Sequence, residues 1–464
     1  MHIANQQLLR TALLGLGFFF LFAGYNSLTN MEKTFLLSLQ KDVPSFHGDG
    51  YIAQSIVYAV FAITLWLAPS VISITGPRLA MFLSAIGYEV FILSLFIPLT
   101  WVTYLSSIMA GCMAAILWTG HVNYLVLNSE PYMIAKCAGL FSAIFQLSMF
   151  PGNLFVYFKF HNIKYIDVET RKSILIVLAG IISIGVIIIG LARPPHRTST
   201  FDANLDEHLS HKKRGPVQAL KKLWTTFFLK EVVALYFIYG ATGLLLAFNH
   251  VVSASIGFTQ HFGDTRKRYV PLAGFFCGLG GVVGAILPFF VTTKKNFLFL
   301  RPLTFIAMVT IILGLLLSYL VLPEDALFGD TTTRPFVESN VAVALMISTL
   351  LGIGENSFTN EMTDLVGTLF PNDSAQAFAA LLFLKNICVA IGFYISNYIG
   401  LYTQIYVMSI FTFVGTIGLT WAGYLLALRQ GQHPSLKGPQ LHAEISPGTI
   451  NSADSLKRHP ATRK

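Results

Sequence analysis

Seven polar side chains lie inside apolar stretches of the chain, where a polar group is costly. They fall on four segments, each long enough to cross a membrane. A charge at the centre of a bilayer costs about 2.5–3.5 kcal/mol on insertion scales, so such residues need water, a solute or a partner on another helix. The pattern predicts a polar cavity between helices. Its candidate residues are Asn26, His121, Asn123, Asn249, His250, Glu355 and Asn356.

Glu355 is the candidate with the most specific chemistry. It follows Gly352 and Gly354, which let other groups approach the helix closely. A carboxylate at this depth needs water, a cation, a proton or a basic partner, and we expect His121 to be that partner because imidazole can relay protons. Two interpretations stay open: a proton- or cation-linked switch, and a neutral acid that hydrogen-bonds a neighbouring helix. For the asparagines, hydrogen bonds that hold helices together are the simpler alternative.

Glu89 and Lys385 are two further charges within apolar segments. Each lies about ten residues from the start of its segment, too deep to face lipid without cost. Partners within the helix bundle would satisfy them, and Lys385 could also extend toward the membrane surface. A structural role and a functional role are both compatible with this position.

The motifs of enzyme chemistry are absent from the sequence. It contains no Walker loop, no H-E-x-x-H and no nucleophile elbow. Its cysteines, Cys112, Cys137, Cys277 and Cys388, have neither paired nor metal-ligand spacing and are expected to be small buried hydrophobic residues. We therefore expect no enzyme activity, no cofactor and no metal site.

The composition places these residues in a membrane protein. Hydrophobic residues make up 54% of the 464-residue chain and charged residues 11%, with a mean hydropathy of +0.64. A soluble domain carries about a quarter charged residues. The net charge of +9 could indicate nucleic-acid binding, but Lys and Arg gather in short loops and tails, away from the aromatic residues. We expect the lipid bilayer, and no nucleic acid, as a partner.

Twelve apolar segments of about 20 residues recur along the chain. The sequence thus predicts an all-α membrane protein with twelve transmembrane helices in two six-helix halves. Pro69 and Pro151 should kink their helices. The glycines of residues 274–284 should allow close helix packing, or less simply a hinge. The predicted spans are 8–28, 51–74, 79–97, 102–127, 133–158, 173–192, 231–256, 269–291, 300–322, 339–366, 375–397 and 402–428.

The domain organisation follows from these spans. Residues 1–192 form the N-terminal half, 193–230 a basic linker, 231–428 the C-terminal half and 429–464 a disordered tail. Lys and Arg are about twice as numerous on the side of the linker and tails as on the other, so both termini should be cytoplasmic. The loop that contains Lys33 and Lys41 should lie on the opposite side. The sequence does not distinguish the plasma membrane from an internal membrane.

Several short motifs resemble one family. In the first half they include the segments FHGDGY (46–51), APSV (68–71), GPR (76–78), LWT (117–119) and GNLFVYF (152–158); in the second half they are GIGE (352–355) and SNY (396–398). Together they resemble the uncoordinated-93-like branch of the major facilitator superfamily, and most of all its short-tailed major-facilitator domain-containing members. The resemblance covers most of the chain. It implies the twelve-helix fold, with spans one, four, seven and ten around a central cavity.

The resemblance implies two functions of different classes. Relatives have been assigned regulatory or accessory roles with ion channels and receptors, so another integral membrane protein is one expected partner. The alternative is a secondary active transporter of an unidentified small solute, coupled to protons or another cation. Ser73 and Ile74 replace the acidic residue and arginine of the general transporter motif, and Leu245 stands where close relatives often place Glu. These departures favour the regulatory function, whereas the polar cavity residues favour transport.

Overall fold

The computed structural model describes residues 2–130, 132–161, 165–193, 225–291, 301–370 and 374–429. Within them, eleven helices are long and apolar enough to cross a membrane. The pair α2 (Gly50–Thr64) and α3 (Ala68–Thr75) makes a twelfth span if it is counted as one, with a bend of 68° at the break. The predicted all-α, multi-pass fold is confirmed. Most of the linker and nearly all of the tail lie outside the described residues, so the predicted domain boundaries stay predictions.

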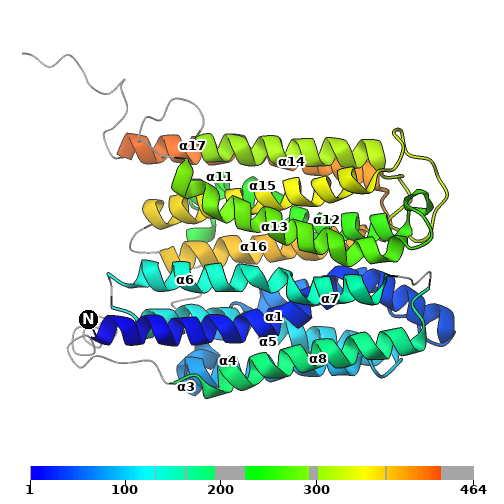
Figure 1. The fold of residues 1–464 in the computed structure, drawn as a ribbon. Coiled ribbons are helices and arrows are strands. Elements are labelled where there is room, and N and C mark those ends of the chain that lie inside the picture. Colours follow the sequence, from blue (N-terminus) through cyan, green and yellow to red (C-terminus); the bar gives the residue numbers. More distant parts are fainter. Residues whose placement is uncertain are drawn as a thin grey trace, which may run out of the picture.

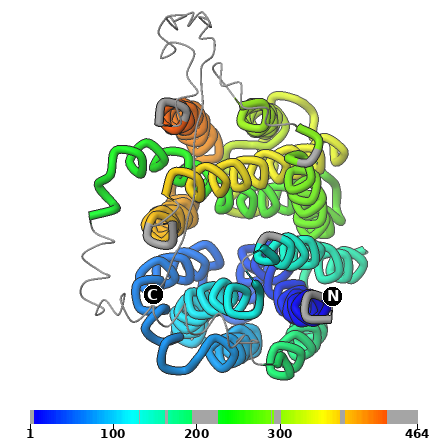
Figure 2. Tube along the Cα trace, turned by 90° about the vertical axis from the view of Figure 1, so that its left-hand side faces the viewer, coloured from blue at the N-terminus to red at the C-terminus, as the bar shows by residue number. Residues whose placement is uncertain are grey.

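The helices fall into two groups that lie side by side (Figures 1 and 2). Each group has its own hydrophobic core: one joins residues of α1 to α8, the other residues of α11 to α17. Two residues cross over: Tyr51 belongs to the second core and Val270 to the first. The helices of the first group are α1 (His2–Asp42), α2, α3, α4 (Pro77–Ser94), α5 (Thr100–Asn128), α6 (Ile134–Gln146), α7 (Pro151–Lys159) and α8 (Val168–Leu191).

The second group begins with a short helix, α11 (Lys230–Ala234), which precedes α12 (Tyr236–Phe258). Its remaining helices are α13 (Tyr269–Phe290), α14 (Pro302–Val321), α15 (Val341–Leu369), α16 (Ser374–Ile395) and α17 (Leu401–Arg429). Three short 3-10 turns, η1 (Leu147–Met149), η2 (Gln260–Phe262) and η3 (Arg266–Arg268), complete the elements. Most helix ends agree with the predicted spans within a few residues.

The predicted end of the first span was wrong. We expected it to stop at residue 28 and Lys33 and Lys41 to lie in a loop, but α1 continues to Asp42 and contains both lysines. The reason is that the polar residues beyond 28 find partners on other helices, so they do not end the helix. The kinks expected at Pro69 and Pro151 coincide with the starts of α3 and α7, where proline occupies one of the first helical positions.

Glycines bring α13 and α15 into backbone contact. A Cβ atom on Gly280 would lie 2.1 Å from the carbonyl oxygen of Thr349, and one on Gly352 would lie 2.2 Å from that of Cys277. Other glycines of α13 face the first half, since a Cβ on Gly274 would lie 2.3 Å from the amide nitrogen of Asn30. The small-residue face predicted for residues 274–284 therefore packs closely on two sides.

Candidate functional site

Glu355 lies in the middle of α15 and is bound by α12. The side-chain amide of Asn249 donates a hydrogen bond to its Oε2 at 2.9 Å, while the other atom of that amide, Oδ1, is buried with no partner among the described residues. Lys385 of α16 is in electrostatic range of the Glu355 carboxylate, but no ion pair joins them. Tyr58 of α2 is also in electrostatic range, so the acid faces both halves.

His121 is not the partner of Glu355. Its ring stacks on Phe141 with a centroid distance of 3.8 Å and also contacts Phe18 and Trp118. The side chain is buried, and neither ring nitrogen has a hydrogen-bond partner in the described part of the chain. The predicted pairing is wrong because this end of α5 packs into an aromatic cluster of the first half. A proton relay between these two residues has no direct contact to use.

The other candidates have separate surroundings. Asn356 accepts a hydrogen bond from Gln146 of α6 at 2.8 Å, which joins the two halves. Asn26 lies 3.5 Å from the Ser148 hydroxyl, and Nδ1 of His250 lies 2.9 Å from the Leu246 carbonyl of its own helix. Asn123 is exposed. The structure therefore brings together Asn249 and Glu355, with Lys385 nearby, and leaves the remaining candidates apart.

One carboxylate oxygen of Glu89 is bound within the first half, while the other, Oε2, is buried without a hydrogen-bond partner among the described residues. Its Oε1 accepts a hydrogen bond from the Ser183 hydroxyl of α8 at 3.1 Å. It has no contact with Lys385, which lies in the other half. This contact fits a structural role for Glu89.

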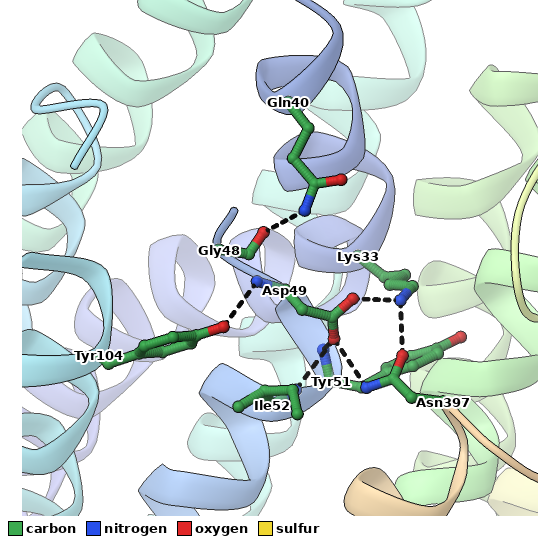
Figure 3. Close-up of polar contacts among 8 residues, drawn as sticks. All are labelled: Lys33, Gln40, Gly48, Asp49, Tyr51, Ile52, Tyr104 and Asn397. Atoms are coloured by element: carbon green, nitrogen blue, oxygen red, sulfur yellow. Dashed lines mark hydrogen bonds and ion pairs between the residues drawn. The ribbon is translucent and has the colours of Figure 1, made fainter. Parts of the chain in front are cut away.

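A second polar cluster joins the two halves at the end where α1 finishes (Figure 3). Lys33 of α1 forms an ion pair with Asp49 and donates a hydrogen bond to the Asn397 side chain at 2.7 Å. The Asn397 amide in turn donates to the Asp49 carboxylate at 2.9 Å. We call these three residues the interhalf clamp, because Lys33 and Asp49 belong to the first half and Asn397 follows α16 in the second.

Local structure holds the clamp in place. Asp49 is the N-cap of α2, and its carboxylate accepts the backbone N–H groups of Tyr51 and Ile52. Its own backbone N–H donates to the Tyr104 hydroxyl at 3.1 Å, and the Lys33 ammonium lies 4.6 Å from the centre of the Tyr51 ring. A Cβ on Gly50 would meet the backbone of α1 at 2.6 Å, so glycine is required at this crossing. These contacts fix the carboxylate for both its partners.

More polar contacts join the halves near the same end. Asp330, between α14 and α15, binds Lys267 at 2.7 Å and Arg266 at 3.0 Å, and it lies 3.4 Å from Lys41 of α1. Asn30 of α1 donates to the Val270 carbonyl of α13 at 3.0 Å. The end of the molecule where α1 finishes is therefore closed by polar contacts between the halves.

Sequence reasoning missed the clamp. Asp49 and Asn397 were noticed only as parts of family motifs, and Lys33 was assigned to a loop. A usable signal was present, because an acidic residue directly before an apolar helix is an N-cap that can also hold a cation. The partner 364 residues away could not be read from one sequence.

Glu32, next to the clamp, was also missed. The side chain is 1% exposed, and its Oε2 accepts a hydrogen bond from the Gln54 amide of α2. Its Oε1 is buried without a hydrogen-bond partner among the described residues. Glu32 and Glu355 thus both accept a hydrogen bond from a neutral amide on another helix. Neither forms an ion pair within the part of the chain that the structure describes.

Comparison with known proteins identifies relatives over nearly the whole chain. The model of a family described as "Ion channel regulatory protein UNC-93" matches residues 45–420. The UNC93-like protein MFSD11 of Xenopus tropicalis is 32% identical over 445 residues, which cover 93% of this chain and 99% of that protein. UNC93-like protein 3 of Arabidopsis thaliana is 24% identical over 419 residues, covering 85% of this chain and 82% of that protein.

A solved structure shares the fold. A POT family transporter in complex with 5-aminolevulinic acid superposes with a TM-score of 0.58 at 14% sequence identity, covering 92% of this chain and 96% of the transporter. At this identity the likeness shows the fold alone. The arrangement of two six-helix halves expected from the sequence is confirmed, and so is the family resemblance read from the short motifs.

Proposed function

Because the chain belongs to the UNC-93 family of major facilitator proteins, we propose that it acts as a regulatory or accessory partner of another integral membrane protein, of the ion channel class. The observation that carries this proposal is the family match, which spans residues 45–420 and includes Asp49 and Asn397 of the interhalf clamp. The family description names ion channel regulation.

The end of α3 and the start of α4 support a function other than typical transport. Where the general transporter motif has an acidic residue and an arginine, Ser73 bonds its own helix at the Ser70 carbonyl and Ile74 is 85% exposed. Arg78 donates to the Gly190 carbonyl at 3.0 Å instead of pairing with an acid. The charge pairing that the general motif supplies is therefore absent from the described contacts of these residues.

We propose the orientation with both termini on the cytoplasmic side. The distribution of Lys and Arg supports it. In this orientation the interhalf clamp faces the exterior or the lumen. A partner that contacts the cytoplasmic end would then detect a change in the distance between the two halves at that cytoplasmic end.

The experiment for the regulatory function combines depletion with rescue. The tagged full-length chain is purified from native membranes, and a stoichiometric channel subunit is identified. Depleting the chain should change the current of that channel, and wild-type chain should restore it. The proposal would be contradicted if no stoichiometric channel subunit is purified with the chain, or if the current is unchanged after depletion.

A transporter is the second candidate, and the surroundings of Glu355 favour it. An acid that accepts one amide hydrogen bond from Asn249, with Lys385 in range, can bind a cation, or can bind a proton and lose its charge. In proteoliposomes we expect saturable solute uptake that Glu355→Gln abolishes without loss of folded protein. Glu89→Gln is the matched control, because it removes another membrane-embedded acid that bonds only Ser183. Absence of uptake for a broad metabolite panel, with channel regulation intact in Glu355→Gln, would leave only the regulatory function.

A further inference from the structure

Glu32 is an acid enclosed by the first half with no cation to neutralise it. The side chain is 1% exposed, and its one hydrogen bond comes from the neutral amide of Gln54. The cation next in the chain, Lys33, points to Asp49 and Asn397 instead. Asp49 is in electrostatic range and carries the same sign of charge as an ionised Glu32 would.

A buried carboxylate in such surroundings is unstable as an anion. It gains too little from one neutral donor to offset the loss of hydration, and the second oxygen gains nothing. A proton on that oxygen removes the charge, while the carbonyl oxygen keeps the Gln54 hydrogen bond. The geometry thus fits a carboxylic acid better than a carboxylate.

No other ionisable group near Glu32 takes over this role. Tyr25 of the same helix is in electrostatic range and is neutral at ordinary pH. On neighbouring elements the ionisable side chains have contacts of their own: Tyr104 with the Asp49 backbone, Tyr51 beneath Lys33, Tyr88 against Tyr25, Arg171 with Asp42, His250 with the Leu246 carbonyl and Tyr269 with Arg268.

We propose that Glu32 is a proton-binding site, which holds its proton while the interhalf clamp is closed and releases it when the clamp opens. On release, the O–H bond breaks, its electron pair stays on the carboxylate and the proton passes to water. The carboxylate is then hydrated and lies beside a Lys33 that has lost its Asn397 partner. The ligand is the proton alone, and the site works in this way whether the chain regulates a partner or carries a solute.

The connection to the clamp runs through the first turns of α2. Gln54, the partner of Glu32, lies between Asp49, which binds Asn397, and Ser55, which donates to the Ala390 carbonyl of α16 at 2.9 Å. Separating α2 from α16 at this end breaks both of these contacts and admits water beside α1. Because the closed arrangement binds the proton and the open one does not, acid favours closure and alkali favours opening.

Infrared spectroscopy of the purified full-length protein tests protonation directly. Protonated carboxyl groups absorb at a different frequency from carboxylates. At neutral pH the spectrum of wild type should therefore contain one protonated-carboxyl band that the spectrum of Glu32→Gln lacks. Gln54→Leu should shift that same band to higher frequency, because the carbonyl oxygen loses its donor. If Glu32→Gln removes a carboxylate band instead, or if Gln54→Leu shifts no band, the proposal is wrong. The Gln54 variant carries the test if Glu32→Gln does not fold.

Distances between spin labels test the coupling. Spin labels are placed at Ser45 and Thr332, which are both exposed and lie in different halves. The distance between them is measured from about pH 5 to about pH 9, a range that includes the pKa values of buried carboxylic acids. Wild type should move from a short to a longer distance as pH rises, whereas Glu32→Gln should keep the short distance throughout. Glu89→Gln, the control, should behave as wild type. Wild-type pH dependence in Glu32→Gln would overturn the coupling.

Discussion

Replacing Asp49 with Asn tests how strongly the interhalf clamp stabilises the protein. The Lys33 and Asp49 side chains are 7% and 19% exposed, so the lysine is buried, the aspartate is half-buried and water screens the pair only in part. Removing one partner of a buried ion pair costs about 3–5 kcal/mol, mainly because the other charge stays buried. Asn can still cap α2 and accept from Lys33, so we expect the lower end, about 3 kcal/mol.

The assay is the apparent Tm in one detergent at one scan rate, because membrane proteins of this size often unfold irreversibly. Lys41→Gln is the matched control: this lysine is 60% exposed and 3.4 Å from Asp330, so its loss should cost less than about 1 kcal/mol. The double variant Lys33→Met/Asp49→Asn should recover much of the loss, since no buried charge is left without a partner.

Two results would refute this reasoning. If Asp49→Asn lowers the apparent Tm no more than Lys41→Gln, the clamp is not a buried ion pair. If the double variant is as unstable as the sum of the single variants, the two residues do not interact.

Three further predictions concern packing, pH and topology. Gly280→Ala should sharply reduce folded protein, because its Cβ would lie 2.1 Å from a carbonyl oxygen, whereas Gly180→Ala, with nothing within 4 Å, should keep or slightly raise the apparent Tm. Burial of Asp330 raises its pKa, but hydrogen bonds and charges from Lys267 and Arg266 outweigh this and hold the pKa below its usual value. Its stabilisation is therefore complete above the unfolded pKa of about 3.9 and lost as pH falls through the folded value, so Asp330→Asn should weaken the acid dependence of the apparent Tm. Epitope tags on both termini should be reachable by antibody only after permeabilisation. A tag that is accessible from outside intact cells would show that the proposed orientation is wrong.

Much of the fold could be predicted because hydropathy reports burial in lipid directly. The helices α5 and α15, for example, begin and end within three residues of the predicted spans. The same measure failed for the last part of α1, where Glu32 and Lys33 are polar and yet buried. Hydrogen bonds with Gln54 and Asn397 offset part of the cost of burying these two side chains, and hydropathy cannot include a partner that is distant in sequence.

The candidate site was predicted in part. Polar residues at mid-membrane depth led to Asn249 and Glu355, which do bond each other. The same argument selected His121, whose ring the structure places among aromatic residues, because side-chain direction around a helix was not determined by one sequence. The clamp required knowledge of which helix ends meet, which the spans alone did not give.

The long separation between Lys33 and Asn397 has a consequence for biosynthesis. Their hydrogen bond spans 364 residues, so at about 5–20 residues per second the ribosome needs roughly 20 to 70 s after making the lysine before its partner exists. During that time the first helix carries an incomplete polar contact within the membrane. Chains that stop before residue 397 never complete it, and we expect the quality-control machinery of the membrane to recognise nascent and truncated chains by this unfinished end.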